Sequence, residues 1–296
     1  MKKFVSLIAL AAFPIAAYAA DATQDWAFLT PDPNAPAPAA PAGGAPPVAV
    51  APPPVPAGVP AIVAQGKGQD VRPCNTCHTP SGMGQPESAN LRGLPVNYFL
   101  EQMHDFASGA RKGPRAAAMA GFAKGMTDDE IKDVAAYYAG LKPATWTLVN
   151  ELDIAPKTYV NRQSQRLRYP GTDTEPVEHR IVEFAQDPAK VRTMDTNAFI
   201  AFVPVAALSR GGLLVNTGAN GTTTACGTCH GANLQGMGDV PGIAGRSPIY
   251  IARQLYTFKN GDRNGVNADM MKQVVAKLDN DDIVGIAAYV GSRNPS

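Results

Sequence analysis

The chain is poor in the residues that most often carry catalysis or contact nucleic acid. Its 296 residues include only four cysteines and four histidines, and charged residues make up 17% with a net charge of +1. A charge this close to zero provides no overall basic field for nucleic acid. Beyond the first residues, no apolar run is long enough to cross the roughly 30 Å of membrane hydrocarbon. The composition therefore argues against a nucleic-acid-binding protein and against a protein with several membrane spans.

The first residues predict a secretory signal peptide. Lys2 and Lys3 form a basic start, residues 4–17 form an apolar run, and Ala17-Tyr18-Ala19 is an A-x-A cleavage site. We expect residues 1–19 to be removed, which leaves a mature chain of net charge −1 because both lysines are lost and no acidic residue is. A retained anchor is the alternative, but the apolar run is too short to favour it. The mature protein is then periplasmic, without a transmembrane segment, and contacts the membrane only through a partner.

Cysteine is confined to one five-residue string that occurs twice. The two copies are Cys74-Asn75-Thr76-Cys77-His78 and Cys226-Gly227-Thr228-Cys229-His230. C-x-x-C-H is the attachment sequence of haem c: the two thiols bond to the vinyl groups of the porphyrin, and the His becomes the proximal ligand of the iron. The sequence therefore predicts two covalently bound haems c. We expect these residues to bind them: Cys74, Cys77, His78, Cys226, Cys229 and His230.

Three other uses of these cysteines fit less well. A structural zinc site needs its ligands at finger-like spacing, but the two pairs lie 152 residues apart. A thioredoxin-like pair begins a helix within a βαβ unit, and neither string has such surroundings. Disulfides are an option in an exported protein, but they do not account for a His after each pair. Haem c is attached outside the cytoplasm, which agrees with the signal peptide.

The second half of the chain repeats the first at an offset of 152 residues, without a gap. The repeat predicts two domains of about 85 residues, 61–142 and 209–296, each able to form a small core around a large apolar cofactor. The matched pairs include Gly66 and Gly218, Tyr98 and Tyr250, Gln102 and Gln254, Arg111 and Arg263, and Met119 and Met271.

Each copy predicts three helices. The terminal helices begin at Thr127 and Asp279 with the acidic residues of a capping box, followed by apolar residues at i, i+3, i+4 and i+7. The other expected helices are 61–69 and 96–106 in the first copy, and 210–218 and 249–258 in the second. Gly66 and Gly218 fall in the first helix of each copy, where we expect them to let it approach the terminal helix closely.

Two segments lie outside the repeat. Residues 20–60 are rich in Pro and Ala, which favour extended conformations, and we interpret them as an arm whose apolar stretch 25–29 docks on a folded domain. Residues 143–208 match neither copy and are too apolar for a disordered linker. We expect an ordered connector with strands near 145–149, 180–184 and 199–205.

A proximal His leaves the sixth position of the iron to be assigned. A Met in that position makes an electron-transfer centre, and an open position permits catalysis. Met119 lies 41 residues after His78, and Met271 lies 41 residues after His230. Met is also a common core residue, but the equal spacing in both copies favours iron ligation. We therefore expect His78 to share its iron with Met119, and His230 to share the second iron with Met271.

These motifs resemble those of class I cytochrome c domains, and the chain resembles the periplasmic two-haem cytochromes c built from two such domains in tandem. The likeness covers about 170 of the 296 residues. It implies an all-α fold class, here with a partly β connector and an N-terminal Pro-rich arm. In that family a Pro carbonyl orients the proximal His. Pro241, 11 residues after His230, fits this pattern, whereas the first copy has Ala89 in that place.

Four other polar residues invite a role at the haems. Arg111 and Arg263 occupy matching positions, where a haem propionate and solvent are equally open as partners. His104 has no His counterpart in the second copy, so we do not expect it to belong to the shared haem machinery. His179 lies in the connector, outside the repeat.

The resemblance and the paired Met residues favour an electron carrier over an enzyme. We expect the protein to pass single electrons in a periplasmic respiratory chain, between redox proteins such as a dehydrogenase, a quinol-oxidising complex or a terminal oxidase. One alternative is the cytochrome subunit of a periplasmic dehydrogenase complex. Another is a two-haem peroxidase or other haem enzyme, but a peroxidase needs one open iron, and both copies have a Met. A catalytic haem with a Cys ligand would need a fifth cysteine, which the chain lacks.

Overall fold

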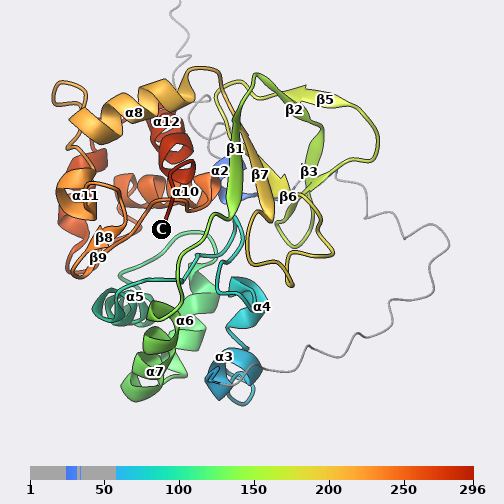
Figure 1. Ribbon diagram of the computed structural model, residues 1–296. Coiled ribbons are helices and arrows are strands. Elements are labelled where there is room, and N and C mark those ends of the chain that lie inside the picture. Colours follow the sequence, from blue (N-terminus) through green and yellow to red (C-terminus); the bar gives the residue numbers. More distant parts are fainter. Residues whose placement is uncertain (1–24, 32–33, 35–57) are drawn as a thin grey trace, which may run out of the picture.

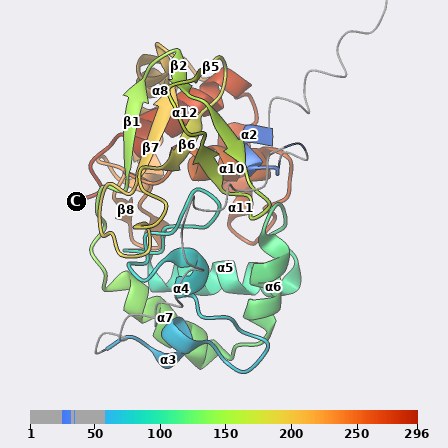
Figure 2. The same cartoon turned by 90° about the vertical axis from the view of Figure 1, so that its right-hand side faces the viewer.

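The computed structural model describes residues 25–31, 34 and 58–296 of the chain. Two helical units lie one above the other, and a small β-rich unit lies beside the upper one (Figures 1 and 2). The predicted signal peptide, residues 1–19, lies outside the described residues, as does most of the predicted arm. In the described part of the chain, no helix is long and apolar enough to cross a membrane.

The lower unit contains the first copy of the repeat. Its helices are α3 (Ala61–Gln65), α4 (Asn75–His78), α5 (Val96–Ser108), α6 (Ala116–Lys124) and α7 (Asp128–Ala139). Helices α5, α6 and α7 pack together around a core that includes Phe99, Ile131 and Tyr138. Helix α6 was not expected from the sequence, and α3 ends four residues before the predicted limit of 69.

The upper unit contains the second copy. Its elements are α8 (Ala207–Thr217), α9 (Gly227–His230), the short strands β8 (Gly236–Met237) and β9 (Val240–Pro241), α10 (Pro248–Lys259), α11 (Ala268–Val275) and α12 (Asn280–Gly291). Helices α8, α10 and α12 form the centre of this unit, and its core is larger than that of the lower unit. The two predicted capping boxes are both present, at Thr127 before α7 and at Asp279 before α12.

The close helix crossing predicted for the repeat occurs only in the upper unit, and at other glycines. Gly66 and Gly218 end α3 and α8 with positive φ angles of 77° and 71°, so they serve turns and not helix packing. The crossing of α8 and α12 instead depends on Gly211 and Gly285. A Cβ on Gly211 would lie 1.9 Å from the carbonyl oxygen of Gly285, a distance that no side chain could adopt.

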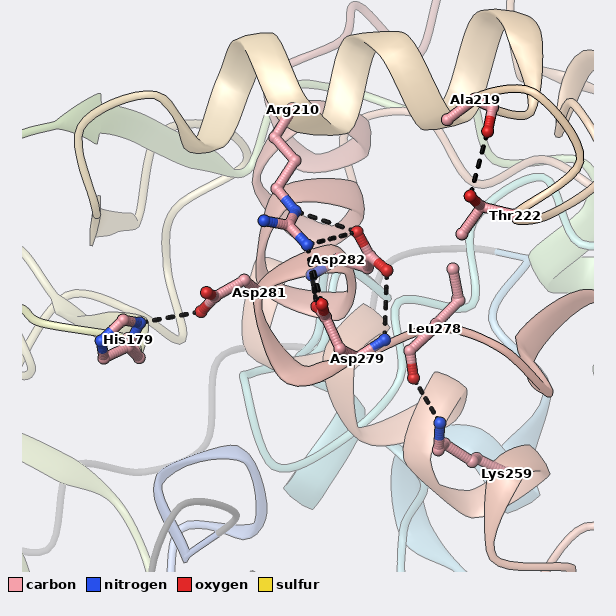
Figure 3. A network of polar contacts seen from close by, with 9 residues as sticks. All are labelled: His179, Arg210, Ala219, Thr222, Lys259, Leu278, Asp279, Asp281 and Asp282. Atoms are coloured by element: carbon pink, nitrogen blue, oxygen red, sulfur yellow. Dashed lines mark hydrogen bonds and ion pairs between the residues drawn. The ribbon is translucent and has the colours of Figure 1, made fainter.

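An ion-pair network on the surface joins α8 to the start of α12 (Figure 3). The Arg210 guanidinium donates to Asp282 through Nε at 2.9 Å, and to both carboxylate oxygens of Asp279. His179 of the connector contacts the neighbouring Asp281 at 2.9 Å and is largely exposed. His179 therefore belongs to a surface ion-pair network, away from both C-x-x-C-H strings in the sequence.

The connector is an ordered β-rich unit, as predicted, and contains more strands than the three expected. They are β1 (Thr147–Glu151), β2 (Ile154–Pro156), β3 (Thr158–Val160), β4 (Arg166–Arg168), β5 (Thr174–Pro176), β6 (Val182–Ala185) and β7 (Phe199–Val203). Strand β7 is central, parallel to β1 and antiparallel to β6, and two small antiparallel pairs, β2–β5 and β3–β4, complete the unit. The described structure is therefore mostly helical, and not all-α.

A buried carboxyl group fastens the connector to the upper unit. Glu183 on β6 is fully buried and accepts hydrogen bonds from Thr147 at 2.9 Å, from the Ser247 hydroxyl at 2.8 Å and from the Ile249 backbone N–H at 3.0 Å. The last two donors belong to the N-terminus of α10, where a negative charge is favourable. Burial nevertheless raises the pKa of Glu183 to about 7, against the effect of these three donors.

The apolar stretch of the N-terminal arm docks on the upper unit, as predicted. Helix α2 (Asp25–Phe28) lies against α10. Ala27 and Leu29 are buried in the upper core, and the Phe28 ring lies 6.2 Å from the ring of Tyr256. These few residues therefore belong to the folded structure although they precede the repeat.

Candidate haem-binding sites

The two histidines predicted to be proximal ligands each end a one-turn helix and are held in the same way. In α4 the Nδ1 atom of His78 lies 2.7 Å from the carbonyl oxygen of Ala89, and in α9 the Nδ1 atom of His230 lies 2.8 Å from that of Pro241. The presence of Ala89 in place of Pro therefore does not remove the contact, because the acceptor is a backbone carbonyl, which every residue has.

This contact prepares each imidazole to bind a metal. A carbonyl can only accept, so Nδ1 must carry the proton, and the lone pair of Nε2 is left for an iron. Burial lowers the pKa of His78 and of His230, which favours the neutral ring that ligation requires. Both histidines thus fit the role of a proximal ligand.

The four cysteines are free thiols, so the disulfide alternative is not realised. Cys77 and Cys229 are exposed, whereas Cys74 and Cys226 are partly buried against the core of their unit. Burial raises the pKa of Cys74 and of Cys226 to about 11, so neither is a ready thiolate. Among the described residues, no group of three His, Cys, Asp or Glu side chains could hold a metal ion.

Met119 and Met271 occupy equivalent places in the two units. Each is the fourth residue of its helix, α6 or α11, and each is partly buried against the core of its own unit. Met270, the neighbour of Met271, is 62% exposed and points away from that core. Met83 is buried under the connector, and Met237 is exposed.

Arginine and glutamine side chains from both units meet where the units touch. Arg111 donates to Gln102 of its own unit and to Gln254 of the other unit, both at 2.8 Å. Arg263 donates in the reciprocal way to Gln102 at 2.7 Å, and more weakly to Gln254. Each guanidinium also stacks on an aromatic ring of its own unit. The matched pairs found in the sequence thus form one nearly symmetric interface.

Two further arginines of the upper unit reach this interface. Arg246 donates to the carbonyl of Asn90, and Arg253 donates to the carbonyl of Pro86 at 2.8 Å. Burial lowers the pKa of Arg253 to about 10 and also lowers that of Arg246. The first copy has no Arg at the two matching positions, so the repeat did not indicate a role for either arginine. His104 lies apart from this cluster and bonds to Asp128 on the surface.

The positive charges of these arginines lie close together, which favours the binding of an anionic group between them. Burial lowers the pKa of Arg111, and repulsion by the nearby Arg263 lowers it further. None of the four arginines makes an ion pair with a described carboxylate. Buried cations are normally paired, so the carboxylates of a cofactor would complete this cluster. The sites therefore fit haem c in three respects: free thiol pairs, histidines with an available Nε2, and buried or half-buried guanidinium groups that form no ion pair with a described carboxylate.

Comparisons with known proteins agree with this chemistry. A family model described as "Cytochrome C oxidase, cbb3-type, subunit III" matches residues 61–137, and one described as "Cytochrome c" matches residues 215–294. A cytochrome c-554(548) of Halomonas halodenitrificans is 38% identical over 74 residues, which are 24% of this chain and 89% of that protein. The chain belongs to the c-type cytochromes.

Longer relatives show that both domains are shared. Cytochrome c4 of Azotobacter vinelandii is 27% identical over 73% of this chain and 82% of its own length. A protein named thiosulfate dehydrogenase electron acceptor, from Thiomonas intermedia, is 25% identical over 74% of this chain and 78% of its own length. The chain is thus a tandem two-domain c-type cytochrome with two covalently bound haems c, and it acts in electron transfer.

Proposed function

We propose that this c-type cytochrome is a periplasmic electron carrier with two haems of His and Met ligation, passing single electrons from one redox protein to another. The observation that carries the proposal is the duplicated site. Each of the two free C-x-x-C-H strings ends in a histidine oriented by a backbone carbonyl, and each helical unit also holds a Met as the fourth residue of the corresponding helix, α6 or α11. The domain limits 61–142 and 209–296 remain part of this proposal.

The assignment of ligands follows from these contacts. Cys74 and Cys77 would hold one haem by thioether bonds, and His78 and Met119 would ligate its iron. Cys226, Cys229, His230 and Met271 would do the same for the second haem. When bound, each haem supplies a reversible one-electron couple, and a Met ligand raises its potential.

The residues of the chain orient the two histidines and would bind the haem propionates. The carbonyls of Ala89 and Pro241 keep the proton on Nδ1, which fixes the ring orientation and increases the basicity of Nε2. Arg111 and Arg263 would neutralise haem propionates at the contact between the units. Because both guanidinium groups reach across that contact, they would hold the two haems in a fixed relation and favour transfer between them.

Two observations support a role beside a dehydrogenase. A relative bears the name thiosulfate dehydrogenase electron acceptor, and the connector gives this chain a folded unit beyond what two cytochrome domains need. We propose that the electron donor is a periplasmic dehydrogenase. A peroxidase is a weaker candidate, because both units carry a partly buried Met where a peroxidase needs one open iron.

The ligand assignment can be tested in the purified holoprotein. Met119→Ala and Met271→Ala should each remove about half of the methionine-to-iron charge-transfer absorption of the oxidised protein, because each deletes one of two sulfur ligands. Met126→Ala and Met270→Ala are the matched controls, one Met near each ligand, and should leave the band unchanged. An unchanged band in Met119→Ala or in Met271→Ala would refute the ligand in that unit, while two haems by mass would still support the thioether sites.

A further inference from the structure

The two helices that carry the candidate Met ligands are held in place differently. Met119 is the fourth residue of α6, and Met271 is the fourth residue of α11, at matching positions of the repeat. Figure 2 shows α6 at the outer edge of the lower unit. Because a Met ligand stays on its iron only while its helix stays in place, the contacts of these two helices determine how firmly each sixth position is closed.

Polar side chains fasten the end of α11 and the turn that follows it. Three hydrogen bonds, each from a side chain to a backbone carbonyl, join residues 274–278 to neighbouring segments. They run from Thr223 to Val274 at 2.7 Å, from Lys259 to Leu278, and from Lys277 to Gly221 at 3.2 Å. The second of them is drawn in Figure 3. Displacement of α11 would break these bonds.

The first copy has no counterpart of these three donors. The positions that match Thr223, Lys259 and Lys277 hold residues without a side-chain donor, namely Val71, Ala107 and Gly125. In the described part of the chain, no side chain forms a hydrogen bond with residues 116–126. Arg115, just before α6, donates to the carbonyl of Gln163 at 2.7 Å. Polar contacts therefore hold α6 at its start and not along its length.

The apolar contacts of α6 are also smaller. Ala123 is buried in the last turn of α6, and the matching residue of α11 is the larger Val275, which is fully buried. Leu278, just after α11, is 1% exposed, whereas the matching Met126 is only partly buried. Since the free energy of burial grows with the apolar area removed from water, α6 is the easier helix to displace.

The charged residues on and around α6 are all basic. Residues 107–126 contain no acidic residue and four basic ones, Arg111, Lys112, Arg115 and Lys124. The last three of these are exposed. The matching stretch, 259–278, also has four basic residues but adds Asp262 and Asp269. A small anion that approaches α6 therefore meets only opposite charge on this stretch.

We propose that α6 opens about its start and lets a small inorganic anion with a donor lone pair replace Met119 at the first iron, whereas α11 keeps Met271 on the second. The inference rests on the proposed His and Met ligation of both irons, and it adds a ligand-binding site to the lower unit only. In this exchange the bond between the iron and the Met119 sulfur breaks, and a bond from the lone pair of the anion forms. No electron or proton is transferred.

The two sites should differ in affinity by a predictable amount. The apparent affinity of each site for an anion is proportional to the fraction of molecules in which its Met helix is open. Hydrogen bonds of ordinary strength, present at α11 and absent at α6, change this fraction by about tenfold or more. We therefore expect the first site to bind an anion at least about tenfold more tightly than the second.

Azide titration of the oxidised holoprotein at pH 8 measures both sites, because each bound azide removes the methionine-to-iron absorption of its own site. The absorption should fall in two equal steps, at azide concentrations about tenfold or more apart. In Met119→Ala the remaining absorption should disappear only at the higher concentration, and in Met271→Ala at the lower one. The reverse order, or a single step that removes the whole absorption of wild type, would overturn the proposal.

Exchanging the contacts between the two copies tests their role directly. Thr223→Val with Lys259→Ala removes two contacts of α11 and should move the second step to lower azide. Val71→Thr with Ala107→Lys introduces their counterparts beside α6 and should move the first step to higher azide. The matched controls are Thr222→Val and Lys132→Ala, whose side chains bond to Ala219 and Asp129 and not to either Met helix. These controls should leave both steps in place.

Two further measurements complete the test. Amide hydrogen exchange, which needs no added ligand, should be about tenfold or more faster in residues 116–126 than in residues 268–278, and equal rates would refute the opening of α6. High salt should weaken the binding of azide to the lower unit and leave that of neutral imidazole unchanged, and an equal response of both would refute the preference for an anion. Absence of the methionine-to-iron absorption before azide is added would instead refute the proposed ligation, so the two failures are distinct.

Discussion

At the scale of residues, the molecule stabilises polar groups in its interior through backbone carbonyls and short side chains more than through ion pairs. His78 and His230 are both held by a carbonyl, and the identity of the residue that supplies it, Ala89 or Pro241, does not change the contact. Glu183 is held by two hydroxyls and one backbone N–H. No cation forms an ion pair with Glu183, so burial has the largest effect on its pKa and favours the protonated carboxyl group. A higher solvent pH favours the ionised form.

Glu183 should therefore make stability depend on pH. Its pKa is raised from an ordinary value of 4.5 to about 7 in the folded protein. Between these values the folded state binds the proton that the unfolded state releases, so the free energy of unfolding falls as the pH rises from about 4.5 to about 7, and levels off above. The full effect is about 3 kcal/mol for such a shift.

Glu183→Gln isolates this effect, because the amide keeps the shape of the side chain and cannot titrate. Denaturant unfolding of both proteins between pH 5 and pH 8 should show the stability of wild type falling relative to the variant as the pH rises. A constant difference between the two proteins across this range would show that Glu183 stays ionised in the folded state.

At the scale of elements, the same repeat produces two different helix packings. In the upper unit, α8 is an 11-residue helix that crosses α12 at Gly211 and Gly285. In the lower unit, α3 has only five residues, and positions 59 and 133, which match these glycines, are Val and Asp. The close crossing is thus specific to the second copy, and it accounts for part of the larger core there.

Gly211→Ala should destabilise the upper unit strongly. Its Cβ would lie 1.9 Å from the Gly285 carbonyl oxygen, which no side-chain movement can relieve, so α8 must move away from α12. Overpacking of this kind costs about 1–3 kcal/mol or more. Gly121→Ala on α6 is the control, because a Cβ there meets no atom within 4 Å, and it should be neutral or stabilising by up to about 1 kcal/mol. Thermal unfolding of the two variants would contradict this explanation if their midpoints fell equally.

At the scale of the whole molecule, elements outside the repeat decide how the two units differ. The connector covers the first attachment string and is itself fixed to α10 through Glu183. Ala27 of helix α2 and Leu29, just after this helix, join the upper core from the other end of the chain. The contact between the units is nearly symmetric, formed by the matched Arg and Gln side chains, whereas the outer surfaces are not.

Features inside the repeat could largely be predicted from the sequence, whereas features that depend on segments outside it could not. The repeat predicted the elements that depend on local pattern, namely the capping boxes at Thr127 and Asp279 and the middle helices. It matched Arg111 with Arg263 and Gln102 with Gln254, but it gave no sign that these side chains meet between the units. It was wrong about Gly66 and Gly218, because a glycine at a helix end and one at a helix crossing have the same local sequence signal. The burial of Met83 by the connector, and the roles of Gly211 and Arg253, could not be predicted, because each depends on segments far apart in the chain.

Two reversible one-electron centres in one chain can be counted by spectroelectrochemical titration of the purified holoprotein. We expect two haems c per chain, both with the methionine-to-iron absorption when oxidised, and two electrons taken up reversibly in total. Uptake of a single electron per chain, or an iron that lacks this absorption, is high-spin and turns over peroxide, would contradict this expectation and support a haem enzyme instead.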